Sequence, residues 1–416
     1  METLKLGMVG AGFVARFQAR AMTQVRGMEL SGVVAPEGAG ELQAFAKANE
    51  LGPCTIYSTV TEMARQVDAV AIYCPNFTRL AVMEEIAAAV KAGAQLKGVI
   101  CEKPLARNVA EARRMVALAE GAKLHTAYFE NQIHMKPIKV QLAQLAPQQR
   151  TMGPLALTRS AEEHGGPHMG WFWDPTRQGG GVLCDMGCHS IAVGWYALTP
   201  LGKSLTFLQP QAVSAEIALL KWGLPKWRAK LLKDRGVDYS KTPGEDFATG
   251  MITYKNPETG QIVKAQFTNS WMFEKQGLRL LMDGMGPGYA FEVNTLIAPL
   301  TIFIGDVAAE AVADQETALE KATASRGLLA VHHNEADLYG YTDENEDAYH
   351  AFLAGRDALL PFSYGLEITK LVTAAYMAAD MKKTIDLTDP KVQKELETYI
   401  PLVQQGRGAE VLYVGK

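Results

Sequence analysis

The stretch from Lys5 to Ala15, KLGMVGAGFVA, runs a short apolar strand into a glycine-rich turn, and a helical pattern follows it. In such strand-turn-helix units the first small residue permits a tight turn and the second lets the backbone approach a pyrophosphate. The third allows the helix to pack closely on the strand. The helix N-terminus then offers free N–H groups and a positive dipole end to phosphates. The stretch therefore predicts a nucleotide-binding turn formed by Gly10, Gly12, Phe13 and Val14.

Short apolar strands alternate with helical stretches throughout the N-terminal part of the chain. Strand patterns occupy residues 5–9, 30–34, 69–73, 99–101 and 124–128, and the clearest helical patterns occupy residues 80–92 and 109–119. Strands that are separated by helices pair in parallel through right-handed crossovers. Residues 1–128 are therefore predicted to form a doubly wound α/β domain with a parallel sheet.

The second half of the chain has a different pattern. Residues 205–220, 247–255 and 261–272 are β-rich and joined by turns, which favours antiparallel pairing in an open sheet that is covered on one face. Residues 345–383 have a helical pattern with an interruption near Leu360 and Pro361. Residues 221–241 are basic and irregular, as in a solvated excursion.

Composition excludes several classes of function. Of the 416 residues, 48% are apolar and 21% are charged, and 41 lysines and arginines face 45 acidic residues, a formal net charge of -4. This balance argues against nucleic acids or membrane surfaces as partners held by bulk electrostatics. No apolar run has the length of a transmembrane helix, and the N-terminus leads directly into a strand pattern, so neither a membrane span nor a secretory signal is expected. The five cysteines lack zinc-site spacing and are expected to be the reduced thiols of a cytoplasmic protein.

A turn of this kind is usually followed, about 20 residues later, by an acidic residue that holds the ribose hydroxyls. Here the second strand leads into Ala35-Pro36-Glu37, which places Glu37 22 residues after Ala15. Either Glu37 binds the ribose or it is an exposed loop carboxylate. Residues 27–43 contain no lysine or arginine that would hold a 2′-phosphate. The pattern favours NAD over NADP as the cofactor.

Two further motifs carry groups that can move a proton. The fifth strand ends in Glu102-Lys103-Pro104, and a lysine at the carboxyl end of a parallel strand faces the crevice where ligands bind. The proline restricts the conformation of Lys103 and allows a cis bond. In the later run GGGVLCDMGCH, Asp185 and His189 lie one turn apart on a shared face if Asp185 begins a helix. A lysine, an aspartate and a histidine together can transfer a proton to or from an alcohol.

Each of these three residues also has a purely structural interpretation. Lys103 can be a surface lysine at a strand end, and His189 can be a satisfied histidine of the core. Asp185 can be the N-cap of the following helix, a role that is compatible with chemistry. The motifs alone leave these alternatives open.

The motifs together make the chain resemble the glucose-fructose oxidoreductase / inositol dehydrogenase / rhizopine catabolism (Gfo/Idh/MocA) family. The resemblance rests on the glycine turn, on Pro75-Asn76 after the fourth strand, on Glu102-Lys103-Pro104 and on the segment from Asp185 to His189. It implies an N-terminal Rossmann domain, residues 1–128, and a C-terminal α/β domain, residues 129–416, with an open, mostly antiparallel sheet. The second domain would bind the substrate and form a homo-oligomer, a dimer or tetramer.

The resemblance also implies roles for individual residues. Lys103 and His189 would lie beside the reacting carbinol, and Asp185 would bind or polarise the substrate. The cofactor would also be contacted by Pro75, Asn76, Glu102 and Lys103. Two positions depart from the family pattern: Arg79 stands where a histidine often follows the Pro-Asn pair, and the segment after the sixth strand, usually arginine-bearing, reads YFENQ. Asn131 is the residue of that segment that we expect to contact the substrate.

Aromatic residues and histidines upstream of Asp185 offer further candidates. Trp171, Phe172 and Trp173 fit either an aromatic wall for a sugar ring or ordinary core packing, and Trp173 is our candidate for substrate binding. His164 and His168 lie in a loop rich in glycine and proline, but no ordered ligand spacing joins them to His189, so no metal is expected. His332 and His333 are interpreted as surface histidines.

The sequence thus predicts an NAD(P)-dependent dehydrogenase that acts on a CH–OH group. The resemblance implies a sugar, sugar derivative or cyclitol as substrate. Oxidation would move a hydride to the nicotinamide and the carbinol proton to Lys103 or His189. Two alternatives stay open: an NAD-dependent glycosidase that uses transient oxidation, and a non-catalytic cofactor-binding sensor or repressor. Retention of the lysine, the aspartate and the histidine argues against the sensor.

Overall fold

In the computed structural model, which describes residues 2–274, 277–297, 300–304, 327–331 and 334–413, the strands predicted in the N-terminal half form one parallel sheet. Together with β3, a short strand that was not predicted, they have the order β3-β2-β1-β4-β5-β6, the order of doubly wound dinucleotide-binding sheets. The strands are β1 (Leu4–Val9), β2 (Met28–Val34), β3 (Thr55–Ile56), β4 (Ala69–Ile72), β5 (Gly98–Glu102) and β6 (His125–Phe129). The predicted α/β class with a parallel N-terminal sheet is confirmed.

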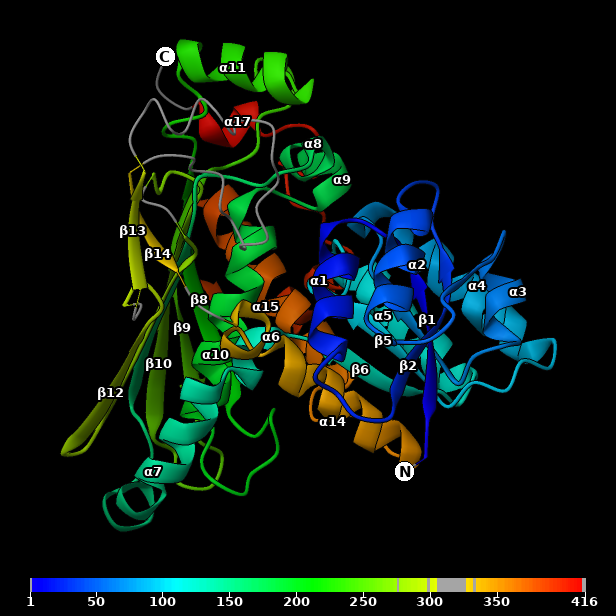
Figure 1. Ribbon diagram of the computed structural model, residues 1–416. Helices are drawn as coiled ribbons and strands as arrows, with labels where there is room; N and C mark the ends of the chain where they lie inside the picture. The colour runs from blue at the N-terminus through cyan, green and yellow to red at the C-terminus, as the bar shows by residue number, and fades with distance from the viewer. Residues whose placement is uncertain (1, 275–276, 298–299, 305–326, 332–333, 414–416) are drawn as a thin grey trace. The chain divides into compact units, whose positions relative to one another are not determined.

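Helices connect these strands, as the alternating pattern predicts (Figure 1). They are α1 (Phe13–Met22), α2 (Ala39–Ala48), α3 (Val60–Ala64), the 3₁₀ turn η1 (Asn76–Thr78), α4 (Arg79–Lys91), α5 (Val109–Gly121) and, after β6, the short α6 (Asn131–His134). Strands β4 and β5 are buried along their whole length. Such burial is typical of parallel strands, because the crossover helices cover both faces of the sheet.

The carboxyl ends of the central strands lie level with one another. Val9 pairs with Val34 on one side and with Ile72 on the other, and Ile72 pairs with Cys101. The strand order reverses between β1 and β4, and ligands of such sheets bind outside the carboxyl ends at this point. The residues that follow β1, β4 and β5 in the sequence therefore lie along one edge of the sheet.

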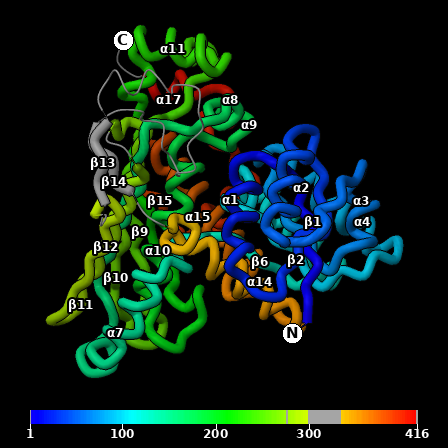
Figure 2. Tube along the Cα trace, viewed as in Figure 1, coloured from blue at the N-terminus to red at the C-terminus, as the bar shows by residue number. Residues whose placement is uncertain are grey.

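A distant segment of the chain completes this part of the fold. The chain divides into a first unit, Met1–Lys136 with Ala336–Thr369, and a second unit, Pro137–Glu335 with Lys370–Lys416. Helix α14 (Tyr341–Leu353), orange in Figures 1 and 2, lies beside the N-terminal elements, and its Ala348 and Phe352 belong to the same apolar core as β1 and β2. The expected division at residue 128 did not assign residues 336–369 to the first unit, because a helical pattern does not reveal which core its apolar face joins.

The second unit is built on a seven-stranded sheet of order β12-β11-β7-β10-β9-β8-β15. Strands β7 and β10 pair in parallel and the other neighbours are antiparallel, so the predicted mostly antiparallel sheet is confirmed. The strands are β7 (Leu157–Glu163), β8 (Gln209–Ala218), β9 (Phe247–Lys255), β10 (Ile262–Ser270), β11 (Arg279–Gly286), β12 (Tyr289–Asn294) and β15 (Ile385–Asp386). Helix α10 (Cys188–Leu198) packs on β7 and β10, and Gly194 permits the close approach, since a Cβ there would lie 3.2 Å from Thr158 Oγ1.

The remaining elements are mostly short. They are α7 (Lys136–Met152), α8 (Gly170–Trp173), α9 (Pro175–Gln178), the π-helical turn η2 (Leu183–Gly187), α11 (Pro225–Arg235), the hairpin of β13 (Leu300–Ile304) and β14 (Gly327–Val331), α13 (Glu335–Leu338), α15 (Phe362–Met381), α16 (Pro390–Leu396) and α17 (Ala409–Leu412). The interrupted helical pattern predicted over residues 345–383 corresponds to α14 and α15. Helix α15 begins in the first unit and ends in the second.

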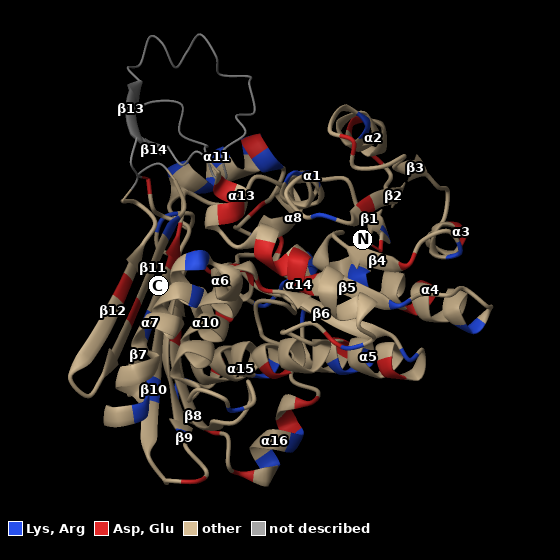
Figure 3. Ribbon diagram, turned by 60° about the horizontal axis from the view of Figure 1, so that its bottom comes forward, with Lys and Arg blue, Asp and Glu red and all other residues tan. Residues whose placement is uncertain are grey.

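The expectation of an irregular segment at residues 221–241 is wrong, because this segment contains α11. Pro225 at the first helical position and Gly236 (φ 70°) just after the end are typical helix boundaries. The helix is strongly basic and buries little apart from Leu231, so it lacks the apolar stripe by which helices are usually predicted (Figure 3). His332 and His333 lie outside the described residues.

Across the described parts of the chain, no helix combines the length and the apolar character that a membrane span requires.

Candidate functional site

The glycine turn connects β1 to α1 at the edge of the first sheet. Gly10 has a φ of 111°, and a Cβ there would lie 2.8 Å from the carbonyl oxygen of Tyr73, so glycine is required at this position. Gly12 is exposed and caps the start of α1, and a Cβ there would have no described protein atom within 4 Å. Phe13 and Val14, both half-buried, begin the helix. The N–H groups of a helix start that faces open space at Gly12 fit the pyrophosphate of a dinucleotide.

Further predicted cofactor residues lie on neighbouring loops of the first unit. Glu37 is exposed between β2 and α2. The next residue, Gly38, lies against the glycine turn, because a Cβ there would be 3.0 Å from the carbonyl oxygen of Ala11. Pro75 follows β4 and leads into η1, whose first residue, Asn76, is buried. The structure thus places the loops that carry Glu37 and Asn76 at the same sheet edge as the turn.

Lys103 directly follows β5 and is half-buried. Its backbone N–H donates to the carbonyl oxygen of Phe129 at 3.1 Å and to Oε2 of Glu102 at 3.2 Å. Its peptide bond to Pro104 is cis. The main chain of the lysine is therefore tied both to β6 and to the carboxylate of its neighbour.

A buried polar network that sequence analysis missed lies behind Glu102. Nε2 of Gln18 donates to Oε1 of Glu102 at 2.7 Å and to Oε1 of Glu344 at 2.8 Å, while Nδ2 of Asn345 donates to Oε1 of Gln18 at 2.6 Å. Burial raises the pKa of both carboxyl groups, and the charge of Glu102 raises the pKa of Glu344 further. Lys103 lowers the pKa of Glu102. The pKa values of both carboxyl groups that share the Gln18 amide are therefore raised, and the charge of the neighbouring carboxyl group adds to the effect at Glu344.

The segment after β6 adds a further buried carboxyl group. Glu130 is fully buried, and burial raises its pKa to about 8 even though the positive charge of Lys103 lowers it. Asn131, which we expected to contact the substrate, is 6% exposed, and its Nδ2 donates to the carbonyl oxygen of Tyr339 at 2.7 Å. This amide joins two distant chain segments of the first unit, a structural role that the sequence pattern did not predict.

Asp185 and His189 lie on one continuous helical segment of the second unit. The π-helical turn η2 contains Asp185 and leads directly into α10, so Asp185 does not begin a helix and its interpretation as an N-cap is wrong. The N–H of Asp185 donates to the carbonyl oxygen of Gly181 at 3.1 Å, and Asp185 and His189 are both buried. Single π-helical turns within helices are frequent at functional sites.

His189 lies close to a carboxylate that sequence analysis missed. Its Nε2 is 3.9 Å from Oε2 of Glu162 on β7, and both side chains are buried. Thr158, Ser160 and Glu162 occupy alternate, buried positions of this strand. The alternation of side chains along a strand could have predicted this position of Glu162, since it places every second residue of β7 on the covered face of the sheet. A carboxylate here can stabilise the protonated imidazole.

A second buried carboxylate holds the glycine run that precedes Asp185. Oε1 of Glu245 accepts hydrogen bonds from the N–H groups of Gly181 (2.9 Å) and Leu183 (3.1 Å) and from the hydroxyl of Tyr376 (2.5 Å). A Cβ at Gly180 would lie 1.9 Å from that hydroxyl, and one at Gly181 would lie 2.2 Å from the carbonyl oxygen of Glu245. The glycines are therefore required by the close approach of this network.

Trp173, our candidate for substrate binding, lies in an aromatic cluster. It is 2% exposed, and its ring centroid is 4.6 Å from that of Trp222 and 5.0 Å from that of Trp271. Core packing accounts for these contacts. Trp171 and Phe172 are half-buried and stack with their centroids 3.8 Å apart, so they are the more accessible aromatic residues of this segment.

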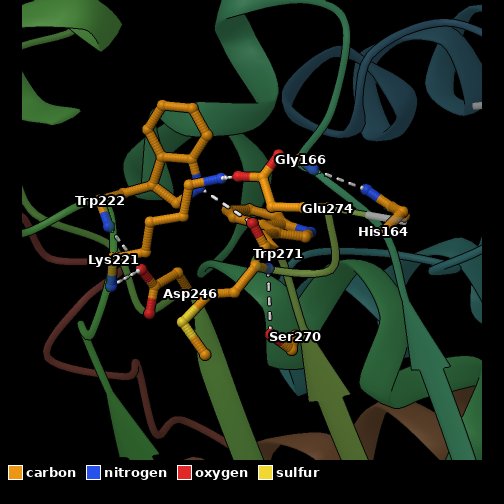
Figure 4. Close-up of polar contacts among 9 residues, drawn as sticks. His164, Gly166, Lys221, Trp222, Asp246, Ser270, Trp271 and Glu274 are labelled. Atoms are coloured by element: carbon orange, nitrogen blue, oxygen red, sulfur yellow. Dashed lines mark hydrogen bonds and ion pairs between the residues drawn. The ribbon is translucent and has the colours of Figure 1, made fainter. Parts of the chain in front are cut away.

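The histidine-bearing loop packs beside this cluster. Figure 4 shows His164, which is buried, accepting a hydrogen bond at Nδ1 from the N–H of Gly166 at 2.9 Å. In the same view Nε1 of Trp222 donates to the carbonyl oxygen of Trp271, and Asp246 accepts the N–H of Trp222. Within the described ranges, no three His, Cys, Asp or Glu residues are grouped so as to hold a metal ion.

The strand order, the glycine turn and the lysine at the end of β5 define a Rossmann-type dinucleotide-binding protein with a second α/β unit. Residues 4–129 match a family described as an oxidoreductase family with an NAD-binding Rossmann fold, and residues 141–285 match the GFO/IDH/MocA C-terminal domain. The chain belongs to the Gfo/Idh/MocA family of oxidoreductases, as its motifs predicted.

Two curated relatives match part of the chain. The rhizopine catabolism protein MocA of Rhizobium meliloti is 29% identical over 197 residues, which are 46% of this chain and 56% of that protein. The 1,5-anhydro-D-fructose reductase of Ensifer adhaerens is 29% identical over 187 residues, 44% of this chain and 53% of the reductase. The chain thus spans about half the length of the curated relatives that it matches.

Solved structures match over nearly the whole chain. GenD2 from gentamicin A biosynthesis, in complex with NAD, has a TM-score of 0.71 at 20% identity and covers 94% of this chain and 97% of its own. A putative myo-inositol dehydrogenase from Sinorhizobium meliloti has a TM-score of 0.65 at 19% identity, with coverages of 93% and 100%. At these identities the likeness shows the fold.

Proposed function

We propose that the protein is an NAD-dependent oxidoreductase that transfers a hydride between the cofactor and a ring or chain hydroxyl of a sugar, sugar derivative or cyclitol. The observation that carries the proposal is the position of Lys103 at the carboxyl end of β5, on the sheet edge that also carries the Gly10–Gly12 turn. Ligands of doubly wound sheets bind at this edge. Family membership supports the reaction class, and relatives named as an anhydrofructose reductase and an inositol dehydrogenase support the substrate class.

The first unit offers the groups that a dinucleotide needs. The N–H groups at the start of α1 would bind the pyrophosphate, and Glu37 would hold the ribose hydroxyls. NAD is favoured over NADP because residues 27–43 carry no lysine or arginine for a 2′-phosphate. Further contacts would come from Pro75, Asn76, Glu102 and Lys103. When bound, the nicotinamide supplies the hydride acceptor for oxidation or the hydride donor for reduction.

Lys103 and His189 are the groups that we assign to the proton of the substrate hydroxyl. As an ammonium, the lysine stabilises negative charge on the oxygen; as a neutral amine, it accepts the released proton at Nζ. The imidazole of His189 accepts a proton at a nitrogen, with Glu162 close enough to stabilise the charged ring. Asp185, one helical turn before His189, binds substrate hydroxyl groups. Either Lys103 or His189 is the first acceptor.

The proposal extends to assembly and location. A dimer or tetramer would form through the second unit, as the family resemblance implies. A cytoplasmic location agrees with the cysteines, because the five, which all lie in described residues, form no disulfide, as is usual in a reducing compartment.

The test is a panel of sugars, sugar acids and inositols incubated separately with NAD and NADP while the absorbance of the reduced cofactor is followed. We expect NAD reduction with at least one substrate and loss of this signal in Lys103→Met. Lys97→Met removes a partly exposed lysine of the same unit that pairs with Glu2, and it should stay active. Sugar release from a glycoside without net reduced cofactor would establish the glycosidase instead. Tight NAD binding without turnover of any compound would support the sensor.

A further inference from the structure

Arg79 is a buried charged residue that the proposed reaction does not use. It is the first residue of α4 and is 5% exposed. Burial of a charge is costly unless the group is satisfied by hydrogen bonds. Here the acceptors are backbone carbonyls: Nε donates to Cys74 at 3.1 Å, and Nη1 donates to Glu102 at 2.6 Å and also to Pro104.

The positions of these carbonyls give the arginine its significance. Cys74 follows β4, while Glu102 and Pro104 are the residues immediately before and after Lys103. One guanidinium therefore bonds to the carbonyls on both sides of the lysine and joins them to the neighbouring strand. A guanidinium presents donors in a rigid planar fork, which a flexible point charge such as an ammonium does not reproduce.

A second path links the same arginine to the lysine. Burial raises the pKa of Glu102, and the charge of Arg79 is among the groups that lower it. The carboxylate of Glu102 in turn accepts the backbone N–H of Lys103. Arg79 thus bonds to both flanking carbonyls, and its charge favours the carboxylate that accepts the N–H of the lysine.

We propose that Arg79 is a positioning residue whose guanidinium fixes the backbone on both sides of Lys103 and thereby orients the lysine amine. This inference rests on the proposed function, in which the position of that amine matters to the reaction. The role is specific to the fork of donors, so a positive charge at residue 79 is not sufficient. It concerns the lysine segment itself, so it can be measured without substrate or cofactor.

The first measurement is the rate at which Lys103 is acetylated in the cofactor-free protein, read by mass spectrometry of its peptide. In Arg79→Met and Arg79→Lys we expect at least about threefold faster labelling, because local opening brings the half-buried amine into solvent. Lys91, exposed at the other end of α4, is the internal reference and should not change. Arg107→Gln is the matched control: it removes a nearby arginine that pairs with Glu111, and it should leave the rate unchanged.

The second measurement is turnover with the substrate found in the panel. A misplacement of about 1 Å costs about 10²-fold in rate, so Arg79→Lys should lower kcat by about 10-fold to 10²-fold. The KM for NAD should change by less than about threefold, because the phosphates are held at the glycine turn. A purely structural role would not produce this split between kcat and KM in a variant that melts cooperatively.

The proposal requires both changes, and the absence of either overturns it. Native labelling and native kcat in Arg79→Lys would show that charge alone is enough. If Arg79→Met does not fold, Arg79→Lys carries the test. Native turnover in Lys103→Met would sink the proposed function, whereas an inactive Lys103→Met beside a fully active Arg79→Lys would sink only the role of Arg79.

Discussion

The segments that carry the predicted proton-transfer residues are held by buried side chains of opposite kinds, a base in one unit and an acid in the other. In the first unit, Arg79 donates to the carbonyls on both sides of Lys103. In the second unit, Glu245 accepts the N–H groups of Gly181 and Leu183, just ahead of Asp185. Both side chains are almost fully buried. Glu245 belongs to no motif that the sequence revealed, and Arg79 was identified there only as a departure from the family pattern.

The direction of the backbone explains why one segment needs a donor and the other needs an acceptor. A strand that ends at the carboxyl edge of a sheet presents carbonyl oxygens beyond its ladder, and buried carbonyls need donors. A helix start presents N–H groups without intrahelical partners, and these need an acceptor. A side chain that donates, such as arginine, therefore suits the segment of Lys103, and a side chain that accepts, such as glutamate, suits the segment of Asp185 and His189.

The two segments also differ in the charges near their proton groups. Lys103 acts electrostatically on two buried carboxyl groups, Glu102 and Glu130. Near His189 lies the carboxylate of Glu162, with its Oε2 at 3.9 Å from Nε2. Removal of the lysine therefore takes away a charge that acts on two buried carboxyl groups, and we expect the two substitutions to have unequal effects.

The largest effect is expected from Lys103→Met, which keeps most of the side-chain length but removes the charge and the protons. Turnover should fall by at least about 10²-fold, the scale of a lost acid–base group. NAD affinity should change much less. His189→Ala should lower turnover by a smaller factor, and the double variant should lose less than the product of the single losses, as for groups that act as one unit. The measurement is steady-state kcat together with an NAD binding titration.

Lys97→Met is the control for a general effect of removing a lysine from the first unit. Near-native turnover in Lys103→Met on the true substrate would contradict the proton role. Equal losses of turnover in Lys103→Met and His189→Ala would contradict the expected difference between the two segments.

The next effect concerns Glu245 and the pH dependence of stability. Burial raises its pKa from an ordinary value of 4.5 to about 7. The folded chain keeps this proton at pH values where the unfolded chain has released it, so the stabilisation is complete below about pH 4.5 and is lost as the pH rises to about 7. Glu245→Gln keeps an acceptor for the N–H groups but does not titrate. The free energy of unfolding, relative to that of the variant, should fall by about 3 kcal/mol between pH 4.5 and 8 in urea titrations.

Glu216→Gln, at an exposed position of β8, is the matched control. Because this variant keeps Glu245, its free energy of unfolding should change with pH as that of the native protein does. A constant difference between the native protein and Glu245→Gln across this interval would mean that Glu245 is ionised in the folded state. In that case the second segment would be held by a full negative charge, and the contrast with Arg79 would become sharper.

Sequence reasoning predicted the parts of this molecule that rest on local pattern. The glycine turn and the alternation of strands and helices predicted the parallel sheet, because both are read within a few residues. Lys103 could be located because Pro104 and the preceding strand mark its place. The basic helix α11 was missed because it lacks an apolar stripe, although Pro225 and Gly236 mark its ends.

The roles of Arg79 and Glu245 could not be predicted, because their partners are distant in the sequence or are backbone atoms. Glu245 and Tyr376, which share a hydrogen bond, are 131 residues apart in the sequence. The partners of Arg79 are carbonyls, which every residue has, so no residue pattern records them. For Trp173 the sequence left two roles open. Its aromatic character alone did not distinguish a residue that binds a sugar ring from one that packs against Trp222.

Gly12→Val tests the predicted phosphate site, which involves neither Arg79 nor Glu245. A Cβ at Gly12 meets no described protein atom within 4 Å, so the fold should tolerate the change, whereas the branched side chain would occupy the space for the pyrophosphate. We expect NAD affinity to fall by about tenfold or more, with thermal unfolding little changed. Gly121→Val, at another uncrowded glycine of the first unit, is the control. Unchanged affinity in a folded Gly12→Val would refute the placement of the phosphates.

The smallest effect is expected from Glu37→Ser, because Glu37 is exposed and its charge acts through solvent. A carboxylate at this loop holds ribose hydroxyls and repels a 2′-phosphate, so its removal should weaken NAD and strengthen NADP. At an effective interaction of about 1 kcal/mol, the ratio of the two affinities should shift by about fivefold. Titration of both reduced cofactors by fluorescence measures this ratio, and Glu120→Ser, an exposed glutamate of α5, serves as the control. Opposite shifts for the two cofactors would place Glu37 at the ribose. No shift in either affinity would make it a bystander of the loop, and cofactor choice would then lie with residues outside the stretch 27–43.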